Sequence, residues 1–501
     1  TGKSNAVYHL LDEITKDGQT TFLVVEPAKG EYKNVFGNCT DVQVFGTNPR
    51  ETPLLRMNPF AFPENIHILE HIDRLVEIFN ACWPMYAAMP AVLKDAIERS
   101  YQKVGWDLRN SESEKGVFPT FFDLLDILPG VIEESHYSKD TQSDYVGALC
   151  TRVKSLTNGI YGSVLCAEDA LTDEALFDCN VVVDLSRVGS METKSLLMGI
   201  LVMKLQEYRM CSSGMNSRLR HVTVLEEAHN LLRKTSAEQS QEGANLQGKS
   251  VEMLANAIAE MRTYGEGFII ADQAPGLLDM SVIRNTNTKI ILRLPDEEDR
   301  KLVGKSAALK EAQIDELSKL PLGVATVYQN EWPEAVLCQV KHYPIPENAV
   351  YCKPAEQTPV NTEFVLSHLA AGQKLEPLGV SEMEQVKRWL KRRELVLGIN
   401  GCRTVGQALE GEPIEKDALE DVLEKLFDSR RVVTFYARAD ADGRKPRMAT
   451  LNRLEDQYEL EQQTAEWLLN HLMTMYIDHC QKPENAKELR RSFLNHGGKL
   501  L

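Results

Sequence analysis

The first five residues of the chain have the types and the order that a phosphate-binding loop requires. Gly2, Lys3 and Ser4, preceded by Thr1 and followed by Asn5, match the second half of the pattern G-x-x-x-x-G-K-[ST]. In such a loop the backbone N–H groups surround the phosphates, the lysine reaches the β- and γ-phosphates, and the serine hydroxyl binds Mg²⁺. These residues are therefore candidates for nucleotide binding, although so short a match also recurs by chance.

The segment that follows has the pattern of a helix and then a strand. Apolar residues at 7, 10, 11 and 14 share one helix face, and an apolar strand is expected at 22–25. A helix that begins at the loop places its N-terminus beside the phosphates, and a strand after it is typical of a parallel sheet. We expect the first strand and the first glycine of the loop to precede residue 1, so that the chain is part of a longer protein.

A pair of acids follows a second apolar strand. The run 222–225 leads directly into Glu226 and Glu227. At the carboxyl end of a buried strand, the first acid can orient Mg²⁺ and the second can polarise the water that attacks ATP. The alternative is a strand end followed by an acidic helix N-terminus, which the helix dipole also favours. Lys3 and Ser4 in the same chain favour the catalytic interpretation.

Two further polar residues are candidates for the same reaction. Gln273 ends the apolar strand in F-I-I-A-D-Q-A-P (268–275), where its amide can sense the γ-phosphate or can be an ordinary strand-to-loop amide. Arg262 ends a helix that begins near Val251. An arginine there can simply complement the helix dipole. The more specific alternative is an arginine finger that reaches the ATP of a neighbouring subunit.

Composition and charge indicate a large α/β protein. The chain has 501 residues, of which 43% are hydrophobic, and no apolar run approaches the length of a membrane span. Its ten cysteines are scattered without a C-x-x-C pair, which fits a reducing, cytoplasmic compartment and predicts no cysteine metal site. The formal charge of −17 is unusual for a protein that coats nucleic acid, so any DNA contact must be local, as in a pore, or arise through oligomerisation.

Seven segments in order, within residues 1–345, resemble the HerA/FtsK superfamily, and within it the HerA-type ATPases are nearest. The segments are T-G-K-S-N (1–5), E-P-A-K-G-E-Y (26–32), M-N-P-F (57–60), V-L-E-E-A-H-N-L-L (224–232), M-R-T-Y-G-E-G (261–267), A-D-Q-A-P (271–275) and N-T-N-T-K-I-I-L-R-L (285–294). The resemblance implies an α/β fold with a P-loop NTPase (RecA-like) core and a mostly parallel sheet. It also implies a ring-forming, usually hexameric, ATP-driven DNA translocase or helicase.

The resemblance assigns a role to each candidate residue. Lys3 and Ser4 are the residues that bind phosphate and Mg²⁺, Glu226 is the acid on the metal side, and Glu227 is the catalytic acid. Gln273 is the sensor and Arg262 is the arginine finger in trans. The chain departs from the usual pattern at position 226, where it has Glu instead of Asp. Proteins of this type often work with a nuclease or another effector in DNA processing or anti-phage defence. The alternatives are a conjugation or type IV secretion ATPase, and an ATPase scaffold that assembles and regulates an effector enzyme.

The whole chain divides into five expected regions, each recognised by a change in residue pattern. Helical stripes mark an insertion, recurring prolines mark a linker, and helical patterns return after it. A polar stretch at 235–249 is expected to be a mobile loop. The regions are the first part of the ATPase core (1–63), an all-helical insertion (64–158), the second part of the core (159–343), a linker or strap (344–380), and a mainly helical C-terminal accessory region with a hairpin (381–501).

The C-terminal region carries two basic segments. The segment 430–448 is expected to form a β-hairpin with a turn at Asp442–Gly443 and with Arg438, Arg444, Lys445 and Arg447 near its tip. Such a hairpin can be a wing-like DNA element or a docking surface for a partner. The segment K-R-W-L-K-R-R (387–393) can contact nucleic acid or can be the solvated face of a helix.

Overall fold

A computed structural model describes most of the chain. It covers residues 2–85, 88–113, 115–167, 170–235, 246–345, 349–354, 361–371, 378, 380–441, 443–480 and 483–501. Three of the expectations from the sequence, at Thr1, at Asp442 and in the loop stretch 236–245, lie outside these residues.

A five-stranded parallel sheet forms the centre of the molecule. Its strands are β1 (Thr21–Glu26), β2 (Val42–Gly46), β5 (Asn180–Asp184), β6 (His221–Glu226) and β7 (Glu266–Ala271), in the order β2-β5-β1-β6-β7. Every neighbouring pair is parallel. The strands are nearly continuous apolar runs, as expected when both faces of a parallel sheet are covered. The predicted fold class, an α/β fold with a mostly parallel sheet, is confirmed.

The two faces of the sheet pack against different helices. Phe22 and Val24 of β1 face a cluster with helices α1 (Lys3–Thr15) and α2 (Tyr32–Phe36). The alternate residues Leu23 and Val25 face the main core on the other side. Because side chains alternate along a strand, one short segment supplies both layers. Two further helices lie in the second half of this core region, α9 (Asp173–Phe177) and α10 (Met191–Ser212).

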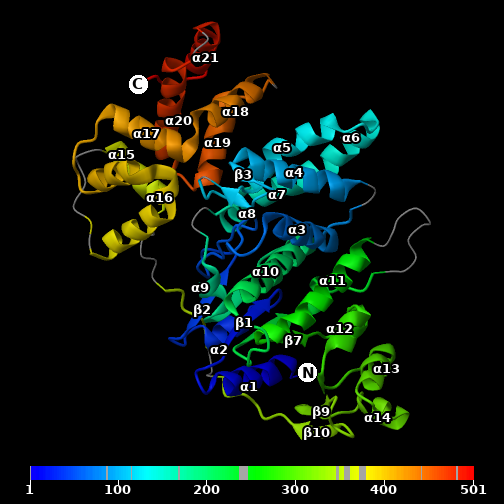
Figure 1. The fold of residues 1–501 in the computed structure, drawn as a ribbon. Coiled ribbons are helices and arrows are strands. Elements are labelled where there is room, and N and C mark those ends of the chain that lie inside the picture. Colours follow the sequence, from blue (N-terminus) through cyan, green and yellow to red (C-terminus); the bar gives the residue numbers. More distant parts are fainter. Residues whose placement is uncertain are drawn as a thin grey trace.

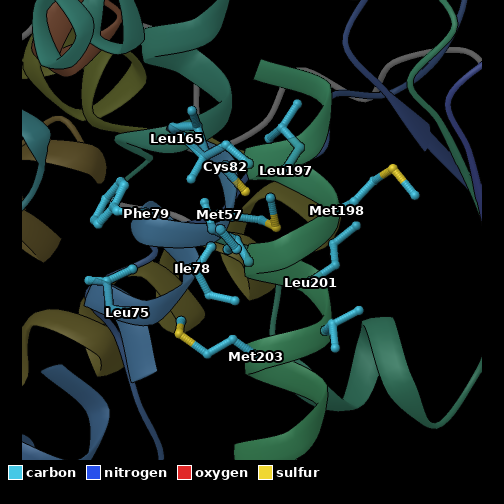
Figure 2. Packing of buried hydrophobic residues seen from close by; sticks show 14 of the residues in the cluster. Met57, Leu75, Ile78, Phe79, Cys82, Leu165, Leu197, Met198, Leu201 and Met203 are labelled. Atoms are coloured by element: carbon cyan, nitrogen blue, oxygen red, sulfur yellow. The ribbon is translucent and has the colours of Figure 1, made fainter. Parts of the chain in front are cut away.

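The long helix α10 joins the sheet to a mainly helical insertion. Figure 2 shows helix α3 beside helix α10, with Ile78 and Cys82 of α3 on the side that faces α10. A Cβ atom on Gly199 would lie 2.8 Å from Ile78, so glycine permits this close approach of the two helices. The insertion therefore shares one hydrophobic core with the sheet. Its helices are α3 (Ile68–Cys82), α4 (Met89–Lys103), α5 (Phe121–Glu134), α6 (Lys139–Tyr145), a π-helical turn (Val146–Cys150) and α7 (Thr151–Thr157). Helix α8 (Gly159–Leu165) follows α7 directly, at the start of the region expected to be the second part of the core.

One expectation for the insertion is wrong, because the segment 64–158 is not entirely helical. Between α4 and α5 the short strands β3 (Trp106–Asp107) and β4 (Glu112–Ser113) form an antiparallel ribbon. Asp107 accepts the backbone N–H of Arg109 and the side-chain amide of Asn110, which stabilises the turn between the strands. Two-residue strands are too short to show an alternating pattern in the sequence.

The chain continues from β7 into a small antiparallel sheet. Its strands are β8 (Thr288–Ile291), β9 (Val324–Gln329) and β10 (Val336–Gln339), in the order β10-β9-β8. Helices α12 (Met280–Asn285), α13 (Glu297–Ser306) and α14 (Glu311–Glu316) lie in this part of the chain, and helix α11 (Leu246–Glu260) precedes β7. Helix α11 includes residues 246–249, so the end of the expected loop at 235–249 is helical instead.

The C-terminal helices form a second hydrophobic core. They are α15 (Thr362–Ala371), α16 (Val380–Leu409), α17 (Lys416–Phe427), α18 (Ser429–Ala441), α19 (Pro446–Tyr458), α20 (Gln462–Asp478) and α21 (Pro483–Asn495). Figure 1 shows them, yellow to red, gathered at the end of the molecule opposite to α1. Helix α15 lies within the expected linker 344–380 but packs in this core through Val365 and Leu366.

The expected β-hairpin at 430–448 is wrong. Its two arms are the helices α18 and α19, and Gly443 in the connection has a φ of 69°, a conformation that glycine adopts readily. Buried residues such as Val433, Tyr436 and Ala439 recur at helical spacing, and this period outweighs the strand preference of V-V-T-F-Y. The interpretation of this segment as a wing-like DNA element depended on the hairpin and is therefore wrong as well. Arg447 forms an ion pair with Glu466 of α20.

Ion pairs join the C-terminal helices to the insertion. Arg453 of α19 binds both carboxylate oxygens of Asp126 on α5, at 2.7 and 2.9 Å, and Arg431 pairs with Asp123. The Arg453 guanidinium also lies over the rings of Phe122 and Phe435. Burial raises the pKa of Asp126, but the hydrogen bonds and charge of Arg453 outweigh it and hold the pKa at about 2. The ionised Asp126 therefore stabilises the fold above about pH 4, and this contribution disappears as the pH falls toward 2.

We predict that Asp126→Asn lowers the free energy of unfolding by about 2 kcal/mol, because it leaves the Arg453 guanidinium without its charged partner. Urea unfolding followed by tryptophan fluorescence measures this change. The control is Asp421→Asn, which breaks an exposed ion pair with Lys425 and should cost less than about 1 kcal/mol. Equal effects of the two substitutions would contradict a stabilising role for the Asp126–Arg453 contact.

Candidate functional site

The candidate residues meet where the strands β1, β6 and β7 end and helix α1 begins. Gly2 stands at the N-terminus of α1 with φ 94° and ψ 8°, and no side chain caps the helix. The first N–H groups of the helix are thus left available for an anion, which the helix dipole also favours. Lys3 and Ser4 follow in the first helical turn. The parallel sheet brings its carboxyl ends to the same edge.

Lys3 links this helix to both acids of β6. Its ammonium lies 2.7 Å from Glu226 and 2.6 Å from Glu227. Burial lowers the pKa of Lys3, but the two carboxylates outweigh it and hold the pKa above its ordinary value. Burial raises the pKa of Glu227, but the hydrogen bonds from Lys3 and Gln273 lower it by more. The pKa of Glu227 therefore lies below its ordinary value, and the carboxyl is ionised at neutral pH.

Glu226 is oriented by a tyrosine that the sequence reasoning did not select. Its Oε1 accepts the hydroxyl of Tyr32 at 2.6 Å, while Oε2 binds Lys3. Tyr32 is held in turn by Glu26 at the end of β1, which accepts the backbone N–H groups of Glu31 and Tyr32. Burial raises the pKa of Glu26 to about 8, although these hydrogen bonds act in the opposite direction. In the sequence, Tyr32 could have been found through its place in the segment E-P-A-K-G-E-Y (26–32), which is one of the segments of the resemblance.

Glu227 occupies a strained backbone position. Its φ of 44° and ψ of 52° are left-handed, and a residue other than glycine adopts them at a cost of about 1–3 kcal/mol. Its carboxylate Oε1 accepts the amide N–H of Gln273 at 2.6 Å in addition to the Lys3 ammonium. The structure therefore brings Lys3, Glu226, Glu227 and Gln273 together, which is the association expected for the catalytic candidates.

Two other candidates are placed differently. The side chain of Asn5 donates to the carbonyl of Lys341 and accepts the backbone N–H of Tyr343, so it anchors the segment after β10 and is not directed at the loop. Arg262 lies before β7 whereas Gln273 lies after it, so the strand separates them by roughly 20 Å. Arg262 is exposed, and it is distant from Glu226 and Glu227 of its own chain.

A groove runs along β7 between these two ends. It has a volume of about 680 Å³ and is lined by Lys3, by Arg262, by apolar residues of α1 and by strand β8. Within the described residues, β7 is the edge strand of its sheet on this side. The groove is therefore bounded by the edges of two different sheets.

The charges at the carboxyl edge of the sheet favour the binding of a cation there. Glu226 and Glu227 share the single ammonium of Lys3, which leaves a net negative charge. Phosphates bound at the N-terminus of α1 would add more, and a hard divalent cation with oxygen ligands compensates for both. The hydroxyl of Ser4 and the carboxylate of Glu226 are oxygen donors of the type that Mg²⁺ prefers.

Comparison with solved structures identifies the fold. VirB4 of Thermoanaerobacter pseudethanolicus aligns with a TM-score of 0.52 and 17% identity, over 68% of this chain and 87% of that structure. The chain has the fold of a P-loop nucleoside triphosphatase. The plasmid coupling protein TrwB in complex with ADP and Mg²⁺ aligns with a TM-score of 0.48 and 12% identity, over 70% of this chain and 86% of that structure.

Sequence comparison gives a shorter match. A protein of Methanocaldococcus jannaschii named "Probable helicase MJECL08" is 29% identical over 123 residues. This match spans 24% of the chain and 22% of that protein. No protein-family profile matches the chain. In the part of the chain that the structure describes, no helix combines the length and the apolar character needed to cross a membrane.

Proposed function

We propose that the protein hydrolyses ATP with Mg²⁺ and uses the energy as a ring-forming DNA translocase or helicase of HerA type. The observation that carries the ATPase proposal is the meeting of Lys3, Glu226, Glu227 and Gln273 at one sheet edge. Three different strands or helices supply these residues, so their meeting is a property of the fold and is not a result of neighbourhood in the sequence.

The contacts of Lys3 suggest how binding and hydrolysis are coupled. In the proposed reaction the ammonium of Lys3 leaves the two acids for the β- and γ-phosphates, which frees the oxygens that it occupies on Glu226 and Glu227. Glu226 and Ser4 would then hold Mg²⁺, which neutralises charge on the phosphates. Glu227 would orient and polarise the attacking water, and the amide of Gln273 would face the γ-phosphate.

The position of Arg262 supports a ring. This exposed arginine is separated from Glu226 and Glu227 of its own chain by the length of β7, roughly 20 Å. It therefore cannot stabilise charge on an ATP bound beside those two acids. We propose that it reaches the ATP bound to a neighbouring subunit, as an arginine finger supplied in trans. Each ATP would then lie between Lys3 of one subunit and Arg262 of the next in a homo-oligomer, which we propose to be hexameric.

The DNA and effector proposals rest on the resemblance in sequence and on the helicase name of the matching protein. The chain has a net charge of −17, so we propose that DNA is bound locally, in the pore of the ring. A nuclease or another effector, in DNA processing or anti-phage defence, is the proposed partner. The second candidate is a conjugation or type IV secretion ATPase, and separation of the strands of free double-stranded DNA during ATP turnover favours the helicase over it.

Glu227→Gln should abolish turnover while retaining ATP binding, because it keeps the shape of the side chain and removes the group that polarises water. We expect a loss in kcat of at least about 10²-fold. Lys3→Ala should weaken nucleotide binding itself, which a fluorescent ATP analogue measures. The matched control is Glu13→Gln on α1, whose carboxylate is 66% exposed and should leave both quantities unchanged. Turnover near the wild-type rate in Glu227→Gln would refute the ATPase proposal.

Arg262→Ala should leave ATP binding intact and reduce hydrolysis by about 10³-fold or more, because it removes a charge that stabilises the transition state from the next subunit. Mixing it with Glu227→Gln subunits should restore part of the activity, since some interfaces then combine an intact Glu227 with an intact Arg262. Arg403→Ala, at an exposed arginine of α16, serves as the control. If the rings exchange subunits and mixing restores nothing, Arg262 does not act in trans.

A further inference from the structure

A buried aspartate and a histidine connect the ends of the two strands that carry Glu227 and Gln273. Asp272 follows β7 directly, and its side chain is only 3% exposed. Its Oδ2 accepts both the backbone N–H of His229, at 2.9 Å, and the ring Nδ1 of His229, at 2.8 Å. Its Oδ1 accepts the backbone N–H of Ala274 at 2.9 Å. Asp272 thus fixes His229 after β6 and the backbone on both sides of Gln273.

The same histidine stands beside the catalytic candidate. Its Nδ1 lies 3.8 Å from Oε2 of Glu227, while Oε1 of that carboxylate is occupied by Lys3 and Gln273. An ionised carboxylate only accepts hydrogen bonds, so the contact with Asp272 places the ring proton on Nδ1. The ring therefore turns the edge that carries the N–H, and not a lone pair, toward Oε2 of Glu227. At 3.8 Å this contact is electrostatic and is not a hydrogen bond, because the Nδ1–H is donated to Asp272.

The backbone of Glu227 shows why such support is needed. Its left-handed conformation is costly and persists only where the surroundings hold it. Asn230 donates its backbone N–H and its side-chain amide to the carbonyl of Glu227, at 3.0 and 2.7 Å. His229 lies between these two residues and is held by Asp272. The turn is therefore fixed on one side by Asn230 and on the other by the end of β7.

We propose that Asp272 and His229 are a positioning pair for the catalytic carboxylate. Asp272 holds the imidazole by its Nδ1–H, and the imidazole together with the turn directs Oε2 of Glu227 toward the attacking water. The pair also keeps Gln273 in register with Glu227 across two strands. This inference rests on the proposed ATP hydrolysis. Glu227, His229 and Asp272 also lie close enough to be considered as metal ligands, but the Nδ1 proton and the two N–H groups on Oδ2 favour positioning.

The test compares substitutions that keep or remove the Nδ1–H donor. His229→Ala should lower kcat by about 10- to 100-fold, the range typical of residues that orient others at a site, with an unchanged Kd for a fluorescent ATP analogue. His229→Asn should recover most of this loss, because the asparagine Nδ2 takes the place of the ring Nδ1 and can still donate to Asp272. His229→Gln, with its amide one bond further out, should not. Asp272→Ala, which removes the oxygen that accepts the Nδ1–H, should resemble His229→Ala.

The controls separate this inference from the proposed function and from misfolding. His136→Ala, at an exposed histidine of the insertion, should behave as the wild type, and thermal melts identify any variant that fails to fold. A wild-type kcat in His229→Ala would overturn the positioning pair, and so would a His229→Asn variant as inactive as His229→Ala, since the ring itself would then do chemistry or bind metal. Failure of the proposed function is a different result: Glu227→Gln would keep its turnover.

Discussion

The contact of one ammonium group with two carboxylates is the interaction on which the candidate site depends. Lys3 stands at the start of α1, and Glu226 and Glu227 stand at the end of β6, so the ion pairs join helix and sheet where phosphates would bind. Without nucleotide, the single ammonium of Lys3 offsets only part of the charge of the two carboxylates. When phosphates compete for Lys3, both acids lose their partner at once, and a cation and a water molecule can replace it. Binding of ATP would thus prepare the acids for their proposed roles.

Much of this site could be predicted because it follows from local patterns with strong physical causes. A buried parallel strand is a short apolar run, and its carboxyl end is marked by the first polar residue after it. Glu226 and Glu227 were found in this way, and Gln273 was found as a polar residue two positions after its strand. The structure pairs both acids with Lys3, and Gln273 donates a hydrogen bond to Glu227. The trans role of Arg262 stays a prediction, since it concerns a contact between subunits.

The residues that sequence reasoning missed act through contacts that are distant in the chain. Tyr32 is 194 positions from Glu226, and Asp272 is 43 from His229, so no local pattern pairs them. Both pairs lie within segments of the resemblance, which was their only signal. The expected hairpin at 430–448 failed for a different reason. Its β-branched and aromatic residues favour a strand, but packing against α20 in the C-terminal core selects the helical period.

The most direct test of ATP hydrolysis at this sheet edge is a structure of the protein with Mn²⁺ and a non-hydrolysable ATP analogue. The anomalous signal of Mn²⁺ would locate the metal in that structure. We expect Mn²⁺ beside Ser4 and Glu226, the Lys3 ammonium on the β- and γ-phosphates, and a water molecule within reach of Glu227. A nucleotide bound elsewhere, with Lys3 still paired to Glu226 and Glu227, would contradict the claim that this sheet edge is the site of ATP hydrolysis.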